Sequence, residues 1–317
     1  MRENTWYGTK EAIFNYLELE KKMDSLKDSM LLDGKAIDAD STRSIMAKAR
    51  TMAGMGPLAM DPDDDGYDPE QDPWSMSFRP GYLKIEKTPS GLAIINVKGM
   101  LVPSHSFFHA FFNDSVTSYE AIKDALNLML EDPDCIGAVL NVHSGGGVAS
   151  GMVECHEAIK RAAAIKQVSG YTGTYAFSAG YGLLCAASPV VAARTAEVGS
   201  IGVIMLHTSL KEMYEQMGVK HTVFRAGEHK ALGQPEEELT ETAKKEFEDS
   251  VAKVNSFFLE AVVSSRPVNM ANHKEWAEGL TFYAEEAVNR GLVDGVGTFE
   301  ALFKNQMVSH YLETHQE

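Results

Sequence analysis

The hydrophobic and polar positions of residues 81–305 follow two alternating periods. Short apolar runs, typical of buried strands, are followed by stretches in which apolar residues recur every three to four positions, as on one face of a helix. Such steady alternation of strands and helices favours an α/β fold. The expected strands cover 83–87, 92–97, 136–142, 167–173, 189–193, 201–206 and 219–225, and the expected helices cover 118–131 (with Ser118 as N-cap), 151–164, 179–187, 209–217 and 235–264.

The first 80 residues have a different pattern. Apolar residues near one stripe of residues 9–32 predict an amphipathic helix, and Ser41 can cap a second short helix. Between Asp61 and Trp74, seven acidic residues stand with three prolines and no basic residue. This segment favours a flexible acidic linker over a calcium loop, because the closing glutamate of an EF-hand is missing. We therefore expect a helical N-terminal arm (1–60), a linker (61–80), a main domain (81–305) and a tail (306–317).

Ser178 is the first candidate for chemistry. It lies between a strand-like run and a helix of small residues, where unpaired backbone N–H groups and the positive end of the helix favour developing negative charge. That environment suits a nucleophile. Serine is also a preferred N-cap residue, and for Ser178 taken alone capping is the favoured interpretation.

Two other segments offer partners for such a serine. The run HSGGG follows the predicted strand 136–142, and glycine lets a backbone N–H approach a reacting carbonyl, so Gly146 and Gly147 are candidate oxyanion donors. Lys230 lies in a loop after the predicted strand 219–225. A lysine accepts a proton from serine only in its neutral form, which requires burial or a nearby cation. Each feature alone also fits a tight turn or a solvated side chain.

The combination is more specific than its parts. Four motifs occur in order: SGGG (Ser144–Gly147), FSAGY (Phe177–Tyr181), GSIGV (Gly199–Val203) and AGEHK (Ala226–Lys230). Together they resemble the signal peptide peptidase A family of serine-lysine peptidases, most closely its tailed-phage branch, the head maturation (prohead) proteases of the lambda type. The resemblance covers about 92–297 and extends to the spacing of the motifs. One departure is Gly145, which stands where the family usually has proline.

The resemblance implies a role for each matched residue. Ser178 becomes the nucleophile, Lys230 the general base, Ser200 the hydroxyl that holds the lysine amine, and Gly147 with Gly146 the oxyanion hole. It also implies that 81–305 is a serine-lysine peptidase domain with the Clp protease/crotonase-like fold, in which ββα units wind into a superhelix. In short members of the family, the serine and lysine of one site come from adjacent subunits of a homo-oligomer.

The implied function is that of a serine endopeptidase of phage head maturation. It would cleave scaffold and capsid proteins, and itself, inside the prohead in the host cytoplasm. The implied partners are the scaffold and major capsid proteins, with the portal as a further candidate, and no cofactor is implied.

Composition narrows the alternatives. A net charge of −16 argues against nucleic acid as a partner, and the chain has neither a signal-peptide pattern nor an apolar run that could span a membrane. The three cysteines are too widely spaced for a metal knuckle and are expected to be buried thiols, and the histidines show no metal-ligand spacing, so no metal is expected.

Three other interpretations stay open. One is a soluble bacterial peptidase related to signal peptide peptidase that degrades peptides. Another is a crotonase-fold enzyme acting on acyl thioesters, or an inactive structural protein; the matched Ser178, Ser200 and Lys230 count against both. The last is a Ser-His dyad with His143 or His229, although neither has an evident acidic partner in the sequence.

Overall fold

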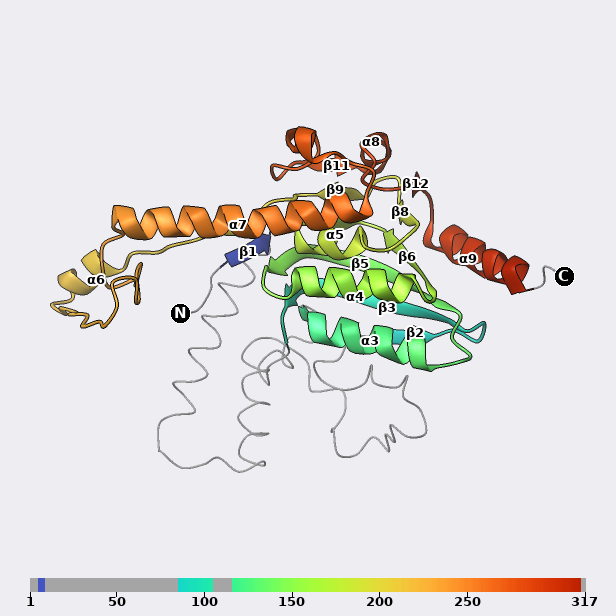
Figure 1. Cartoon of the computed structure of the whole chain (residues 1–317), viewed down its shortest axis with the longest axis horizontal. Helices are drawn as coiled ribbons and strands as arrows, with labels where there is room; N and C mark the ends of the chain where they lie inside the picture. Colours follow the sequence, from blue (N-terminus) through green and yellow to red (C-terminus); the bar gives the residue numbers. More distant parts are fainter. Residues whose placement is uncertain (1–4, 9–84, 105–115, 315–317) are drawn as a thin grey trace, which may run out of the picture.

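The computed structural model describes residues 5–8, 85–104 and 116–314. In these residues a curled, mixed sheet is covered by helices, which confirms the α/β class (Figure 1). The strands are β1 (Thr5–Gly8), β2 (Ile85–Lys87), β3 (Leu92–Val102), β4 (Val116–Ser118), β5 (Gly137–Val148), β6 (Gln167–Thr172), β7 (Tyr175–Phe177), β8 (Val190–Ala192), β9 (Glu197–Gly199), β10 (Ile204–Met205), β11 (Thr281–Tyr283) and β12 (Gly295–Val296). The helices are α3 (Tyr119–Glu131), α4 (Met152–Ala163), α5 (Ala179–Leu184), α6 (Lys211–Gln216), α7 (Glu241–Ser265), α8 (Ala284–Asn289) and α9 (Phe299–Thr314), with a 3-10 helix η3 (Met270–Glu275).

The long strand β5 is the centre of the sheet. Its first half pairs in parallel with β3 on one side and with β6 on the other. Near its end the partner on the second side changes, because β7 pairs with it at Ser144↔Ala176 and β1 pairs with it from Gly146 to Val148. The path then continues from β7 to β9 and β11. The sheet therefore divides around β5 into two branches.

Helices α3 and α4 cover one face of this sheet in the way their periodicity predicts. Ser118 caps α3, since its hydroxyl accepts a hydrogen bond of 3.1 Å from the N–H of Ala121. The buried face of the helix includes Ile122, Leu126 and Met129. Burial of such a stripe of apolar side chains, each worth about 1.5–3 kcal/mol, holds the helix against the strands.

Helix α7 has two different halves. Its C-terminal half packs on α4 and α5 and buries Phe258 and Val262, whereas Ala243 is the only fully buried residue in its first three turns. Figure 1 shows that α6 and the loops around it gather at the N-terminal end of α7, beyond the sheet. We call residues 206–240 the projecting arm.

The prediction of a strand over 219–225 is wrong. These residues form no strand, and Phe224 is 92% exposed. The alternating pattern of TVFRA suits a strand, but the segment lies in the projecting arm, where no strand of the described residues runs beside it to complete its hydrogen bonds.

The structure describes only some residues of the expected N-terminal arm, linker and C-terminal tail. The amphipathic helix expected over 9–32 and the acidic linker lie outside the described residues, while Thr5–Gly8 of the expected arm form the strand β1. At the other end, α9 continues to Thr314 across the expected start of the tail at residue 306. The three cysteines are buried thiols, as expected, and burial raises the pKa of Cys155 and Cys185 to about 12.

Candidate active site

Three of the four motifs meet at one end of the sheet. Strands β5, β7 and β9 are parallel neighbours, with Ser144 opposite Ala176 and Phe177 opposite Gly199. The residues that follow these pairs therefore emerge at the same edge. This edge, the carboxyl end of parallel strands, is where α/β sheets place their ligand sites.

Ser178 has the conformation of a strained turn residue. Its backbone is at φ 53° and ψ −125°, outside the extended region that N-cap residues adopt, and its side chain makes no capping hydrogen bond. A non-glycine residue in this part of conformational space costs about 1–3 kcal/mol and is found mostly at functional sites. These observations do not support a purely capping role for Ser178.

The hydroxyl of Ser178 is also unusual. The residue has no exposed surface, and its Oγ has no hydrogen-bond partner among the described residues. A buried hydroxyl without a partner costs about 1–3 kcal/mol. The backbone is held from both sides, since Ser178 N–H donates to Gly199 O at 2.8 Å and Gly182 N–H donates to Ser178 O at 2.9 Å. The fold therefore holds an unpaired hydroxyl in a fixed place.

The glycine segment lies next to this serine. A Cβ on Gly180, in the first turn of α5, would come within 2.8 Å of Ser144 O, so α5 starts directly against β5. A Cβ on Gly147 would come within 2.0 Å of Leu101 O, which leaves room for glycine alone. The segment does not turn as the sequence pattern indicates; it continues β5 to Val148, because β3 and β1 supply ladder partners.

Ser144 distinguishes the two candidate oxyanion donors. Its buried hydroxyl donates to Gly99 O at 2.6 Å and accepts from the N–H of Gly146 at 3.1 Å. In this conformation the N–H of Gly146 is engaged, so Gly147 is the better candidate of the two. The role of Ser144 could not be inferred from the sequence, where it is only the first letter of a glycine motif.

Ser200 follows β9 and is the next neighbour of this turn. It too has a left-handed backbone, with φ 51°, and its N–H donates to Leu280 O at 2.6 Å. Because Gly199 accepts from the N–H of Ser178, the two serines leave adjacent strands side by side. Two strained serines on neighbouring strands are thus part of one edge.

Lys230 is not brought to this edge within the chain. It is exposed and lies in a tight turn of the projecting arm, where its N–H donates to Gly227 O at 3.1 Å. Its neighbour His229 contacts Glu246 on the first turns of α7, and Leu210 N–H donates to Pro235 O at 2.7 Å. These contacts fold the arm onto itself and onto α7, away from α5 (Figure 1).

The histidines next to the motifs do not contact Ser178. His143 contacts the hydroxyl of Thr174 and lies 4.3 Å, between ring centroids, from Tyr175. Since the Ser178 hydroxyl has no partner in the described part of the chain, no Ser-His dyad is formed there. His229 does have an acidic neighbour, Glu246, but in the projecting arm.

A buried histidine that sequence patterns did not identify lies behind the site. His156 of α4 is fully buried; its Nδ1 lies 2.6 Å from Gly182 O, and its Nε2 lies 2.9 Å from Ser265 Oγ. Burial lowers the pKa of His156. A neutral ring satisfies both contacts, by donating to Gly182 and accepting from Ser265. His156 thus ties α4, α5 and α7 together.

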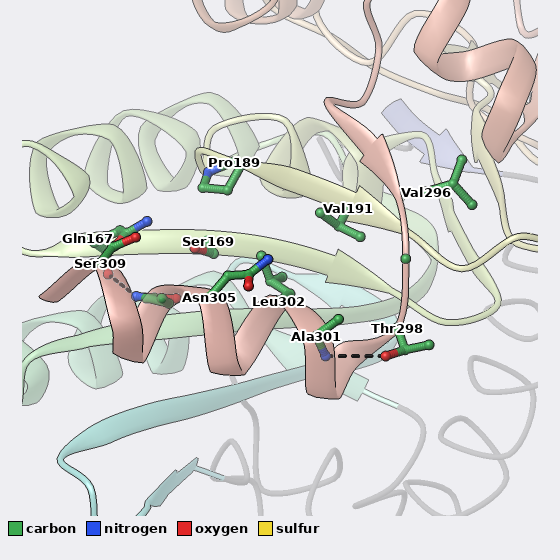
Figure 2. A pocket seen from close by; sticks show the side chains of 12 residues that line it. Gln167, Ser169, Pro189, Val191, Val296, Thr298, Ala301, Leu302, Asn305 and Ser309 are labelled. Carbon is green, nitrogen blue, oxygen red and sulfur yellow. Dashed lines mark hydrogen bonds between the residues drawn. The ribbon is translucent and has the colours of Figure 1, made fainter. Parts of the chain in front are cut away.

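A separate cavity of about 230 Å³ lies between α9 and the strands β6, β8 and β12 (Figure 2). Its lining includes Ser169, Val191, Leu302 and Gln306. The Ser169 hydroxyl and the Gln306 carbonyl are buried without a hydrogen-bond partner in the described residues, while Gln306 Nε2 donates to Gln167 O at 2.9 Å. None of the candidate catalytic residues lines this cavity.

The described residues also bear on metal binding and on membrane crossing. No group of three or more histidine, cysteine, aspartate or glutamate side chains in that part of the chain could hold a metal ion. No helix there has the length and apolarity that crossing a bilayer requires.

Comparison with known proteins adds sequence relationships to this geometry. The sequence model of peptidase family S49 matches residues 160–312, which include Ser178, Ser200 and Lys230. The chain is 27% identical over 257 residues to the capsid assembly protease C of Escherichia phage lambda, covering 81% of this chain and 54% of the relative. It is 27% identical over 211 residues to the head-tail preconnector protein GP5 of Enterobacteria phage P21, covering 67% of this chain and 42% of the relative.

The chain therefore spans about half the length of these curated relatives. Among solved structures, it is similar to an enoyl-CoA hydratase from Shewanella pealeana at 10% identity and a TM-score of 0.43, covering 76% of this chain and 82% of that one. The family match spans three of the four motifs and the strands that position them. Residues 160–312 are thus similar to peptidase family S49.

Proposed function

We propose that this chain is a serine endopeptidase with Ser178 as its nucleophile. The observation that carries the proposal is the strained, buried Ser178, whose unpaired hydroxyl follows β7 at the edge where Ser144 of the glycine segment lies against the first turn of α5. The match to peptidase family S49 supports the same chemistry. Strain and an unsatisfied hydroxyl are costs that a purely structural serine has no reason to carry.

The reaction follows from these positions. Ser178 Oγ attacks the carbonyl carbon of the scissile peptide bond and gives its proton to the neutral amine of Lys230. The N–H of Gly147 stabilises the oxyanion that forms, and the C–N bond then breaks as the leaving amine takes the proton. Water hydrolyses the acyl-enzyme ester in the second half of the reaction. Ser200 holds the lysine amine in line with the serine.

The lysine that completes the site belongs to a second copy of the chain. In its own chain Lys230 is exposed, and the projecting arm that holds it lies at the far end of α7 from α5 (Figure 1). A lysine base, however, must be desolvated to be neutral. The projecting arm that carries it also exposes Met217 and Phe224, at 69% and 92%. Exposed apolar side chains on a protruding segment favour contact with another subunit, which would bring Lys230 and this apolar surface together onto a neighbour.

We assign the enzyme to phage head maturation. Its substrates would be scaffold and major capsid proteins within the prohead in the host cytoplasm, with the portal as a further partner. This assignment is supported by the similarity to the capsid assembly protease of phage lambda over 81% of this chain. Incubation of the purified protein with the capsid and scaffold proteins encoded beside it, followed by sequencing of the new termini, tests it; intact substrates would contradict it.

A complementation experiment tests both the nucleophile and the shared site. Ser178→Ala and Lys230→Ala should each be inactive alone towards a fluorogenic peptide. Co-expressed in equal amounts, they should recover about one quarter of the wild-type activity, because half of the sites receive an intact serine and half of those receive an intact lysine. A fluorophosphonate probe should label Ser178 in the wild type.

The outcomes separate the two ideas. Recovery in the mixture supports a site formed by two copies. Two inactive variants without recovery would place the dyad within one chain and overturn the shared site. Activity that persists in Ser178→Ala would overturn the nucleophile itself. Glu228→Ala, which changes a residue of the same motif that has no assigned catalytic role, is the control variant and should stay active.

A further inference from the structure

We propose that the first strand of the chain, β1, occupies the peptide-binding groove beside Ser178 and thereby inhibits the enzyme. This proposal rests on the proposed function, because it assigns an occupant to the same site. It concerns Thr5–Gly8, which belong to none of the four motifs.

The groove is defined by the strands around the nucleophile. Strand β7 accompanies β5 at Ser144 and ends at Phe177, where the chain turns to Ser178. Strand β5 continues for four more residues, so beyond Ser144 its edge is left without β7 as a neighbour. The second edge is β10, which begins four residues after Ser200. The gap between these two strand edges lies along the glycine segment of β5 and has room for one strand.

Strand β1 fills this gap in register with both edges. It runs antiparallel to β5, with Tyr7 opposite Gly147 and Gly8 opposite Gly146, and antiparallel to β10, with Trp6 opposite Ile204. Tyr7 thus lies opposite the candidate oxyanion donor. The backbone of β1 thus lies along the glycine segment, where the proposed function requires an extended substrate to present its carbonyl to Gly147.

Strand addition explains why such a segment binds. Main-chain hydrogen bonds to an exposed strand edge hold an extended peptide with little dependence on its sequence. A tethered segment also meets its groove at an effective concentration in the millimolar range, whereas a free substrate has to compete at its own concentration. The absence of exposed surface on Ser178 agrees with a groove that is already filled.

Variants of β1 test this inhibition in the full-length enzyme. Trp6→Pro and a deletion of residues 2–8 should both raise kcat/KM for a fluorogenic peptide, since proline removes a ladder N–H. If β1 fills nine groove sites in ten, the rise is about tenfold. Ala12→Pro, four residues beyond β1, is the matched control and should leave kcat/KM unchanged within about twofold. A synthetic peptide of residues 2–10 should inhibit the deletion variant competitively.

Hydrogen exchange gives a readout that does not require activity. In Ser178→Ala, the amides of 147–148 and 204–205 should exchange faster when Trp6→Pro is added, but not when Ala12→Pro is added. Unchanged exchange at these amides overturns the proposal. So does a wild type that cleaves the peptide with the same kcat/KM as the deletion variant. Both outcomes leave the proposed function in place. A wild type that neither cleaves peptides nor labels at Ser178 overturns the proposed function, and with it the inhibitory role; the exchange result still decides whether β1 lies in the groove.

Discussion

Replacing Ser178 should make the protein more stable while it abolishes activity. Ser178→Ala removes a buried hydroxyl that has no partner, which is worth about 1–3 kcal/mol when the small cavity is ignored. Ser178→Gly also relieves the left-handed backbone at φ 53°, worth about 1–3 kcal/mol. Glycine in turn costs about 0.5–1 kcal/mol of unfolded-state entropy and loses the burial of one carbon, about 0.8 kcal/mol.

Ser169 provides the matched control for these opposing effects. It is equally buried and its hydroxyl also lacks a partner, but it lies in the regular strand β6. At each position, the free energy of unfolding of the alanine variant is subtracted from that of the glycine variant. The costs of introducing glycine are similar at both positions, so they cancel when the difference at Ser169 is subtracted from the difference at Ser178. The remainder is the backbone strain of Ser178, about 1–3 kcal/mol in favour of glycine.

Urea unfolding at constant m-value measures each of the four variants. We expect the free energy of unfolding of Ser178→Ala to exceed that of the wild type by about 1 kcal/mol. This corresponds to a rise in melting temperature of about 2–4 °C for a domain of this size. A double difference near zero would refute the idea that strain is stored at Ser178. A loss of stability in both Ser178 variants would refute the cost assigned to its hydroxyl.

Three further predictions follow from the packing. Gly147→Ala should lower the melting temperature and abolish peptidase activity, because its Cβ would lie 2.0 Å from Leu101 O; a variant that melts like the wild type would contradict this. Arg266→Met should lower the free energy of unfolding in urea by about 2–3 kcal/mol, since it leaves Asp294 without two hydrogen bonds of 2.9 Å. The double variant with Asp294→Asn should lose less stability than the two single variants added together. Simple additivity would contradict the pairing. Because burial lowers the pKa of His156 below 6.5, the unfolded chain binds a proton that the folded one does not, so stability is full above pH 6.5 and falls below it. His156→Gln should remove that part of the slope in unfolding free energies measured between pH 7.5 and 5.5, and an unchanged slope would assign the pH dependence to other groups.

Periodicity alone located most of the elements that hold the site. The strand before the glycine motif and the small-residue helix after Ser178 are where their patterns place them, because both are continuous runs of small and apolar residues that the fold buries on every side. The glycine motif itself was misjudged as a turn. Three glycines carry no side-chain pattern, and they stay extended in β5 only because β3 and β1 provide partners that are distant in sequence.

The position of Lys230 in the fold could not be predicted from any pattern in the sequence. A motif match assigns the residue a role, but the place of the projecting arm depends on contacts within its own turns and with the start of α7, which the motif does not specify. The expected strand at 219–225 failed for the same reason, since a strand requires a neighbour that the sequence of the segment does not name. The strain at Ser178 and its orphan hydroxyl are likewise properties of packing.

The exposed projecting arm has a consequence for how the enzyme is controlled. If each copy provides its lysine to one neighbour and uses the lysine of another, only assembled subunits turn over substrate. Dilution then dissociates the subunits and stops the reaction, although each molecule stays folded. Crowding many copies into a small closed shell would then be sufficient to start proteolysis, with no dedicated activator. The specific rate should accordingly climb with enzyme concentration and level off once the subunits are saturated with one another.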